Sequence, residues 1–248
     1  MKAYYRLLLA VTLSTTALGG CISHSKTANV KADQRDMPIR VLMVGGGTSH
    51  DFNRWYKQAD GNTLSMDNLC RVIYTNNTDS IPYYLAAADV LYLATNQPIT
   101  LAGRNAIFEF AAAGKGLILG HPALWYNYKD WPEYNLKLVS GGASSHDSYG
   151  SFDEELVNIK HPVTVGVAHQ FTLKDERYHY ILDPAGPGIE VLANSRAANN
   201  SKVYPSVFVV KNPKARIVGI ALGHDAASHD IADYRLMLRQ AVKWVADR

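Results

Sequence analysis

Three histidines stand where β-strands are expected to end. His50 follows the loop GGGTS, His121 directly follows the apolar run GLILG, and His224 follows IVGIALG. A single histidine is more often structural, but in open α/β sheets ligands bind at the carboxyl ends of the strands. The three imidazoles therefore predict a site at one edge of a sheet, with His50, His121 and His224 as catalytic residues. Neutral imidazoles also bind divalent metal ions, so the same three histidines are candidate metal ligands.

Two further groups fall in a segment expected to hang over that edge. His146 ends the loop GGASSH, and Asp175 and Glu176 are adjacent in the chain. Carboxylates near neutral imidazoles can fix a tautomer, relay a proton or share a divalent metal. The alternative interpretation is that Asp175 and Glu176 form a solvated pair on a loop.

A dense aromatic stretch follows His121. Aromatic faces line sugar-binding sites, but they equally fill a loop-rich core. From this stretch we predict Trp125 and Tyr128 as substrate contacts, with a packing role as the alternative. The aromatic residues are Trp125, Tyr126, Tyr128, Trp131 and Tyr134.

The elements that must position these residues alternate between strand and helix patterns. Short β-branched or apolar runs bounded by turn residues predict buried strands, and a helix is expected between each pair. This order predicts a mainly parallel sheet with helices on both faces. The expected strands are Ile39–Val44, Arg71–Tyr74, Val90–Ala94 and Gly116–Gly120, and the expected helices are Asp51–Asp60, Ile81–Ala88 and a third that Thr100 caps and that ends near Gly114.

The second half of the chain is less regular. From Pro122 to Pro187 we expect an elaborated insertion with one strand near Glu155–Ile159. Three more strands follow, the last two joined as a hairpin by the turn Lys211–Lys214, and an amphipathic helix closes the chain from Ile231. These strands are expected at Ile189–Ala193, Ser206–Val210 and Arg216–Leu222.

The N-terminus has the layout of a secretory signal. A basic start, the apolar run Leu7–Leu13 and small residues lead to Leu-Gly-Gly-Cys21, which resembles the lipobox of bacterial lipoproteins. We expect a signal peptide over residues 1–20, lipidation of Cys21, a flexible tether over 21–37 and a folded domain over 38–248. The alternative is a plain secreted protein. Ile22, by resemblance to lipoprotein sorting, favours the outer membrane, facing the periplasm.

The composition and the absence of certain motifs exclude several classes of protein. The 248 residues are 47% hydrophobic, 19% charged and carry a formal charge of +3, which falls to +1 without the first twenty residues, so no nucleic-acid partner is expected. Cys70 has no second cysteine beside it in the domain, and no disulfide is expected. Motifs for serine hydrolases, phosphate loops, dinucleotide binding and short zinc signatures are absent from the sequence.

Several segments together resemble the ThuA-like (trehalose utilisation) family, in the right order and over nearly all of 38–248. They are VLMVGGGTSHD, GKGLILGH, a W-x-x-Y at Trp131, the GG-x-x-x-H that ends at His146, HPVTVGVAHQFTLKDERY, and GIALGHD. The resemblance implies a flavodoxin-like fold related to class I glutamine amidotransferases. Those relatives carry a nucleophilic cysteine after a central strand, where this chain has His121, so glutaminase chemistry is not expected.

The resemblance also implies a substrate class: trehalose-like glycosides, in their 3-keto forms made by a partner sugar dehydrogenase. A proton beside the keto group is acidic, so a general base could drive elimination and hydrolysis, or isomerisation. We expect His121 or Glu176 as the base, with His50 and His224 polarising the carbonyl or holding a divalent metal. The family positions His146, Asp175 and Tyr178 are expected to bind the sugar. The alternatives are a non-catalytic glycan-binding surface lipoprotein and a purely structural metal site.

Overall fold

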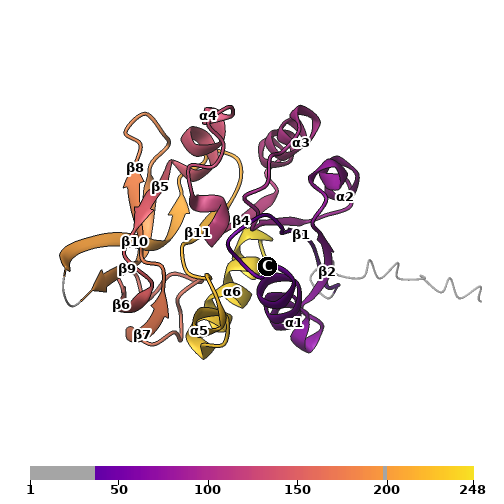
Figure 1. Cartoon of the computed structure of the whole chain (residues 1–248). Helices are drawn as coiled ribbons and strands as arrows, with labels where there is room; N and C mark the ends of the chain where they lie inside the picture. The colour runs from indigo at the N-terminus through magenta and orange to yellow at the C-terminus, as the bar shows by residue number, and fades with distance from the viewer. Residues whose placement is uncertain (1–36, 198–199) are drawn as a thin grey trace, which may run out of the picture. The chain divides into compact units, whose positions relative to one another are not determined.

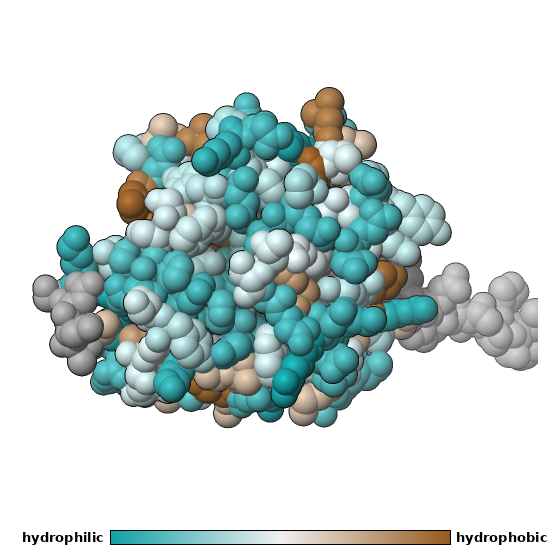
Figure 2. Space-filling model, in the orientation of Figure 1, coloured by the Kyte–Doolittle hydropathy of each residue, from teal (hydrophilic) through white to brown (hydrophobic). Residues whose placement is uncertain are grey.

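The computed structural model of the protein describes residues 37–197 and 200–248. The expected signal peptide, Cys21 and all of the expected tether but Met37 lie outside these residues. Among the helices that the structure describes, none has the length and apolar character needed to span a bilayer. The face turned to the viewer in Figure 2 is largely hydrophilic, with hydrophobic residues in small separate groups.

A nine-stranded sheet organises the domain, and its first five strands are parallel. Their spatial order is β2-β1-β3-β4-β11, the doubly wound arrangement in which the first two strands exchange places. All five were expected within a residue or two at either end, and β1 and β4 were expected with the same bounds. The strands are β1 (Ile39–Val44), β2 (Cys70–Thr75), β3 (Val90–Leu93), β4 (Gly116–Gly120) and β11 (Ile217–Ile220).

Helices cover both faces of the parallel strands, as expected (Figure 1). One hydrophobic core joins the strands to α1 (Gly61–Ser65) and α6 (Ala232–Val245), and a second joins them to α2 (Ile81–Leu85) and α3 (Leu101–Ala112). Strands buried on both faces read as continuous apolar runs, which is why these segments were recognisable. The expected first helix begins as a π-helical segment over Asn53–Asp60 and continues into α1.

Helix α3 shows how local sequence sets its ends. The side chain of Thr100 accepts the backbone N–H of Gly103, and Gly114 adopts a positive φ of 77° just after the helix. Both positions were expected from the sequence. Leu101 is 72% exposed in the first turn of the helix, whereas Phe110 packs inward.

The second half of the chain extends the sheet with antiparallel strands. β10 pairs with β11 as the expected hairpin, and β9, β6 and β7 continue the sheet outward. These strands are β6 (Gly150–Leu156), β7 (Gln170–Asp175), β9 (Ile189–Ala197) and β10 (Asn200–Val210).

The insertion is more regular than the sequence indicated. It contains β6 and β7 and a separate two-stranded sheet of β5 (Gly141–His146) and β8 (Tyr178–Leu182), together with the short helix α4 (Pro132–Tyr134). The single strand expected near Glu155–Ile159 was wrong, since β6 ends at Leu156 and the chain then turns. β5 was missed because its sequence, GGASSH, has no alternation of large apolar residues to mark a strand.

Candidate functional site

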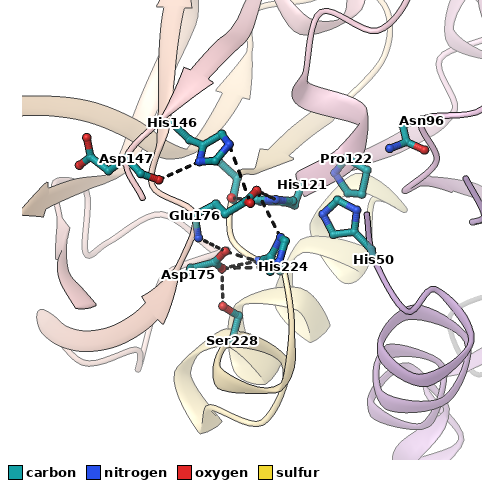
Figure 3. Close-up of polar contacts among 12 residues, drawn as sticks. His50, Asn96, His121, Pro122, His146, Asp147, Asp175, Glu176, His224 and Ser228 are labelled. Carbon is teal, nitrogen blue, oxygen red and sulfur yellow. Dashed lines mark hydrogen bonds and ion pairs between the residues drawn. The ribbon is translucent and has the colours of Figure 1, made fainter. Parts of the chain in front are cut away.

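The three loops that leave β1, β4 and β11 meet at the carboxyl edge of the parallel strands. They bring His50, His121 and His224 together, with ring centroids 5.2 Å apart for His50 and His121 and 4.8 Å apart for His50 and His224. Figure 3 shows the three imidazoles around one point, with Glu176 reaching in from the opposite side. The convergence expected from the strand ends is therefore found in the structure.

The loop after β1 is fixed by a side chain from the next loop of the sheet. Asn96 accepts the backbone N–H of Thr48 at 3.0 Å and donates to the Thr48 carbonyl at 3.0 Å. Gly47 has a φ of 128°, and a Cβ there would lie 1.7 Å from the Asn96 oxygen. Only glycine therefore allows the loop to approach Asn96 and direct His50 toward the site.

Hydrogen bonds to carbonyl oxygens orient two of the imidazoles. His121 is fully buried, and its Nδ1 lies 2.7 Å from the carbonyl oxygen of Ala221. His50 Nδ1 lies 3.2 Å from the carbonyl oxygen of Thr48. A carbonyl can only accept, so both Nδ1 atoms carry the proton and both Nε2 atoms present a lone pair. Each Nε2 atom is buried and, among the described residues, has no hydrogen-bond partner.

Glu176 completes the cluster from the turn between β7 and β8. Its Oε2 lies 3.2 Å from His224 Nδ1 and 3.5 Å from His121 Nε2, which is long for a hydrogen bond. One ligand atom from each of His50, His121, Glu176 and His224 falls within 4.8 Å of all the others. These four side chains are the ones that the sequence predicted to be catalytic.

The local electrostatics keep the imidazole of His50 neutral and the carboxylate of Glu176 charged. Burial lowers the pKa of His50 to about 4, and the neighbouring His121 adds to this shift. The contact with His121 lowers the pKa of Glu176 to about 2; burial opposes the shift, and His224 and His146 reinforce it. Near neutral pH the site thus combines an uncharged imidazole at His50 with an anionic carboxylate.

Asp175 lies beneath the cluster and holds its backbone. It is fully buried, and its carboxylate accepts the N–H groups of Gly223 and Glu176 at 2.8 and 2.7 Å and the hydroxyl of Ser228. The backbone N–H of His224 approaches the same carboxylate at 3.3 Å. The expectation that Asp175 contacts substrate differs from this geometry, because every oxygen of its side chain is turned toward the protein.

A second buried network supports the same turn from the other side. The carbonyl oxygen of Gly223 accepts from Tyr56 Oη at 2.6 Å and lies 3.0 Å from His229 Nε2. His229 Nδ1 lies 2.7 Å from Asp60, so both ring nitrogens face acceptors. Burial disfavours the charged imidazole, but the charge and hydrogen bond of Asp60 outweigh it and raise the pKa of His229. A buried imidazolium–carboxylate pair therefore anchors the residue that precedes His224.

A cavity of about 320 Å³ opens over the cluster and is walled partly by aromatic rings. Tyr178 lies against His121 with ring centroids 4.0 Å apart, and Trp125 meets Tyr178 and His146 edge-on at 5.1 and 5.6 Å. Flat apolar walls beside polar groups suit a small polar ligand such as a sugar. The lining residues are Thr48, Ser49, His50, Asn96, Pro122, Trp125, Asn127, His146, Glu176 and Tyr178.

His146 is the imidazole most exposed to this cavity. Its Nδ1 lies 2.7 Å from the carbonyl oxygen of Asp147, so that nitrogen carries the proton and Nε2 presents a lone pair. Nε2 lies 3.8 Å from Glu176 Oε1. Asp147 is held in turn by Arg177, through nitrogen–oxygen contacts of 2.7 and 2.6 Å, and by His179 at 2.8 Å. These contacts between the end of β5 and the start of β8 thus fix His146 in an orientation that faces the cavity.

Of the residues expected to bind substrate, His146, Tyr178 and Trp125 line the cavity. Tyr128 does not: it is buried, donates to the carbonyl of Thr95 and packs against Trp131. The packing alternative for this aromatic stretch is the correct one at Tyr128. Sequence reasoning missed Asn96 and Asn127; Asn96 follows the end of β3, so the strand-end signal that pointed to His50 could have found it.

The fold and the site define the class: a flavodoxin-like α/β protein with a histidine–glutamate cluster at the carboxyl edge of its parallel strands. The chain belongs to the ThuA family, described as trehalose utilisation, whose model matches residues 40–245. The family membership that the sequence resemblance predicted is thereby confirmed. No curated protein sequence matches this chain.

Solved structures agree on the fold. A ThuA-like protein from Bacteroides uniformis has a TM-score of 0.72 and 21% identity, covering 87% of this chain and 94% of its own. One from Parabacteroides merdae has a TM-score of 0.71 and 18% identity, covering 84% and 90%. The glutaminase domain of Trypanosoma brucei CTPS, with bound acivicin, has a TM-score of 0.52 and 12% identity, covering 85% and 94%. The glutamine amidotransferase-like fold is thus confirmed.

The shared fold does not imply that this chain catalyses the glutaminase reaction. His121 stands directly after β4, and Cys70, the one cysteine among the described residues, lies at the amino end of β2, away from the site edge. Burial raises the pKa of the Cys70 thiol to about 12, so it is not a reactive thiolate.

Proposed function

We propose that this protein is a carbohydrate-processing enzyme that abstracts a proton beside the carbonyl of a keto glycoside, with 3-keto forms of trehalose-like sugars as its substrates. One observation carries the proposal. The ring of His146, whose Nε2 is basic, lines the same aromatic-walled cavity as two members of the cluster, His50 and Glu176. Base catalysis requires such a nitrogen within reach of the substrate proton.

The base is best assigned to His146 rather than to His121 or Glu176. His121 is fully buried beneath Tyr178, so its ring cannot reach a substrate carbon without displacing that residue. The low pKa of Glu176 makes its carboxylate a weak base. His146 Nε2 is open to the cavity and its ring is fixed by the Asp147 carbonyl. Glu176 and His50, which both line the cavity, then form the polar floor beside the carbonyl end of the sugar.

The proton balance of the step is simple. His146 Nε2 takes the proton from the carbon between the keto group and the anomeric carbon, and the electron pair moves into the carbonyl as an enolate. The enolate re-forms the carbonyl by expelling the anomeric oxygen, which takes the proton back from His146. Addition of water to the resulting unsaturated ketone completes hydrolysis. Reprotonation of the enolate without expulsion gives exchange or isomerisation instead.

The test incubates the purified protein in D₂O with 3-keto-trehalose and, separately, with unoxidised trehalose. Glucose release is followed by chromatography and deuterium at the carbon beside the keto group by NMR. Cleavage of the keto sugar alone supports elimination and hydrolysis, and deuterium exchange without cleavage supports isomerisation. Binding of the keto sugar with neither change supports the glycan-binding lipoprotein. Absence of binding by a folded protein overturns the keto-glycoside proposal.

We also propose that the protein is lipid-anchored through Cys21 at the outer membrane, facing the periplasm, and works with a sugar dehydrogenase that forms the keto substrate. The basic, apolar and small-residue order before Leu-Gly-Gly-Cys21 supports the anchor. Mass spectrometry of the mature N-terminus tests it: a diacylglyceryl-modified Cys21 is expected, and a chain that begins at an unmodified residue contradicts the anchor.

A further inference from the structure

We propose that His50, His121, His224 and Glu176 bind one divalent transition-metal ion at the floor of the cavity. The ion binds whichever sugar the cavity accepts. Glu176 joins the three histidines that the strand pattern indicated, and all four side chains place a ligand atom near one point.

The lone pairs of the cluster are turned toward one another. Because the Nδ1 atoms of His121 and His50 are committed to carbonyl oxygens, their bare Nε2 atoms face the interior of the site. Glu176 adds a carboxylate oxygen to the same point. Buried nitrogen lone pairs set against an anion repel one another unless a positive charge lies between them. A cation at this point would satisfy all four groups at once.

Protonation of the imidazoles alone would leave some of these four groups without a partner. A proton on His121 Nε2 would have to bridge 3.5 Å to Glu176, and it would leave the buried Nε2 atom of His50 without a partner. An orphaned buried acceptor costs free energy that a bound metal removes.

The separations fit a single coordination sphere. Ligand atoms that each lie ~2.1 Å from a tetrahedral metal are ~3.4 Å apart, and opposite ligands of an octahedral metal are ~4.2 Å apart. The observed 3.2 and 3.5 Å from Glu176 Oε2 to His224 and His121 match the first value. The upper limit of 4.8 Å within the four-residue set requires only small side-chain adjustments.

The types of ligand atom determine which metal ions the site prefers. Three imidazole nitrogens and one carboxylate suit divalent first-row transition-metal ions such as Zn²⁺, Co²⁺, Ni²⁺, Mn²⁺ or Fe²⁺, whereas Mg²⁺ and Ca²⁺ prefer all-oxygen sites. The cavity lies over the cluster on its open side, which leaves room for a ligand to approach the ion. When bound, such an ion supplies Lewis-acid polarisation of a carbonyl oxygen.

Hydrogen bonds to groups outside the cluster also fix the proposed ligands, as is usual for metal ligands. The carbonyl oxygens of Ala221 and Thr48 fix two imidazoles, and Asp175 fixes the backbone on either side of the cluster, at Glu176 and at Gly223. A metal site of this kind is present before the ion arrives, so binding is expected without a large rearrangement.

The test strips the full-length protein with a chelator and titrates it with Zn²⁺, Co²⁺, Ni²⁺, Mn²⁺ or Fe²⁺ by calorimetry, Fe²⁺ without oxygen, and with Mg²⁺ and Ca²⁺ in parallel. We expect about one transition-metal ion per chain, visible ligand-field absorption with Co²⁺, and no comparable binding of Mg²⁺ or Ca²⁺. Glu176→Gln and His50→Ala should weaken binding at least about tenfold. His169→Ala, at an exposed histidine outside the site, should leave it unchanged.

Thermal unfolding of each variant shows whether it is folded, and the nearly isosteric Glu176→Gln guards against a collapse of the site. Saturable binding that is equal in the wild type and in Glu176→Gln and His50→Ala would place the metal elsewhere and overturn the assignment. So would the absence of binding by any of the five transition metals to folded, chelator-stripped protein. Neither result involves a sugar, so failure here is distinguishable from failure of the keto-glycoside proposal.

Discussion

Asp175 and His224 are joined through the backbone: the Asp175 carboxylate accepts the N–H of His224 at 3.3 Å and that of Gly223 at 2.8 Å. The same carboxylate accepts the N–H of Glu176 at 2.7 Å. One buried side chain therefore fixes the relative position of two members of the cluster, Glu176 from the end of β7 and His224 from the end of β11. The separation of 3.2 Å between their side chains depends on this arrangement.

Asp175→Asn should disrupt the site and the fold together. The NH₂ group of the asparagine would face some of the N–H and O–H donors that the carboxylate now accepts. Those buried donors would therefore lose their hydrogen-bond partners. We expect a loss of about 1–3 kcal/mol in the free energy of unfolding, measured in urea, and weaker metal binding. Asp153→Asn, a half-exposed carboxylate on β6, serves as the control. Unchanged stability in Asp175→Asn would show that this network does not hold the turn.

His146→Gln tests the base assignment. Glutamine retains polarity but has no basic nitrogen, so turnover of the keto sugar should fall by about 10²–10⁴-fold, with KM and thermal unfolding nearly unchanged. His169→Gln provides the matched substitution at an exposed histidine outside the cavity. If His146→Gln turns over normally while His121→Gln or Glu176→Gln does not, the base lies in the cluster instead.

Trp125→Ala removes an aromatic wall of the cavity. Trp125 contacts His146 and Tyr178 with its ring, and we expect its indole face to pack on the sugar. Binding of the keto sugar should weaken by roughly three- to tenfold, and Trp125→Phe should recover part of the loss. Kd measured by calorimetry decides between the outcomes; equal affinities in the wild type and in Trp125→Ala would remove Trp125 from the binding site.

Glu154→Gln changes how stability depends on pH. Glu154 on β6 is fully buried beside the hydroxyl of Ser206, and burial raises its pKa to about 8. The folded state therefore binds more protons than the unfolded state between pH 4.5 and 8, and this group's contribution to stability falls as pH rises through that window. The glutamine cannot ionise and removes this fall.

The measurement is the difference in free energy of unfolding between the wild type and Glu154→Gln, taken at several pH values. The difference should shift in favour of the variant from pH 4.5 to 8, by about 4 kcal/mol in total. Glu155→Gln, at the neighbouring carboxylate paired with Arg196, should show no such trend. A difference independent of pH would mean that Glu154 is ionised in the folded protein.

Asp60→Asn should be the most destabilising of these substitutions. It leaves the imidazolium of His229 without its buried counter-charge, and both side chains are fully buried. A loss of about 3–5 kcal/mol in the free energy of unfolding is expected. Asp79→Asn changes an exposed carboxylate and should have little effect. Small losses in both variants would indicate that His229 is neutral in the folded protein.

The sequence predicted the parallel half of the fold well because its strands are buried on both faces. Runs such as IRVLMV and GLILG have no other plausible role, and their ends located His50 and His121. The antiparallel half gave a weaker signal. β5 buries only Gly141, Gly142 and Ala143, so no pattern of large side chains revealed its pairing with β8.

Within the site, residue type was easier to predict than residue role. Glu176 and Asp175 are neighbours in the chain, yet one faces the imidazoles and the other faces backbone donors 48 positions away. Tyr128 follows Trp125 by three positions, yet it donates to a buried carbonyl. These differences depend on long-range contacts, which a local pattern cannot show.

The three clustered histidines come from the ends of parallel strands, whereas Glu176, His146, Trp125 and Tyr178 come from the insertion. The sheet edge and the insertion therefore contribute different parts of one site. Substitutions at Trp125 and Tyr178 can reshape the aromatic wall of the cavity while the imidazoles keep their places on the sheet. Substitutions at His146 or Glu176 would instead remove the proposed base or a proposed metal ligand, so the aromatic wall is the part of the insertion that can vary without loss of the proposed chemistry.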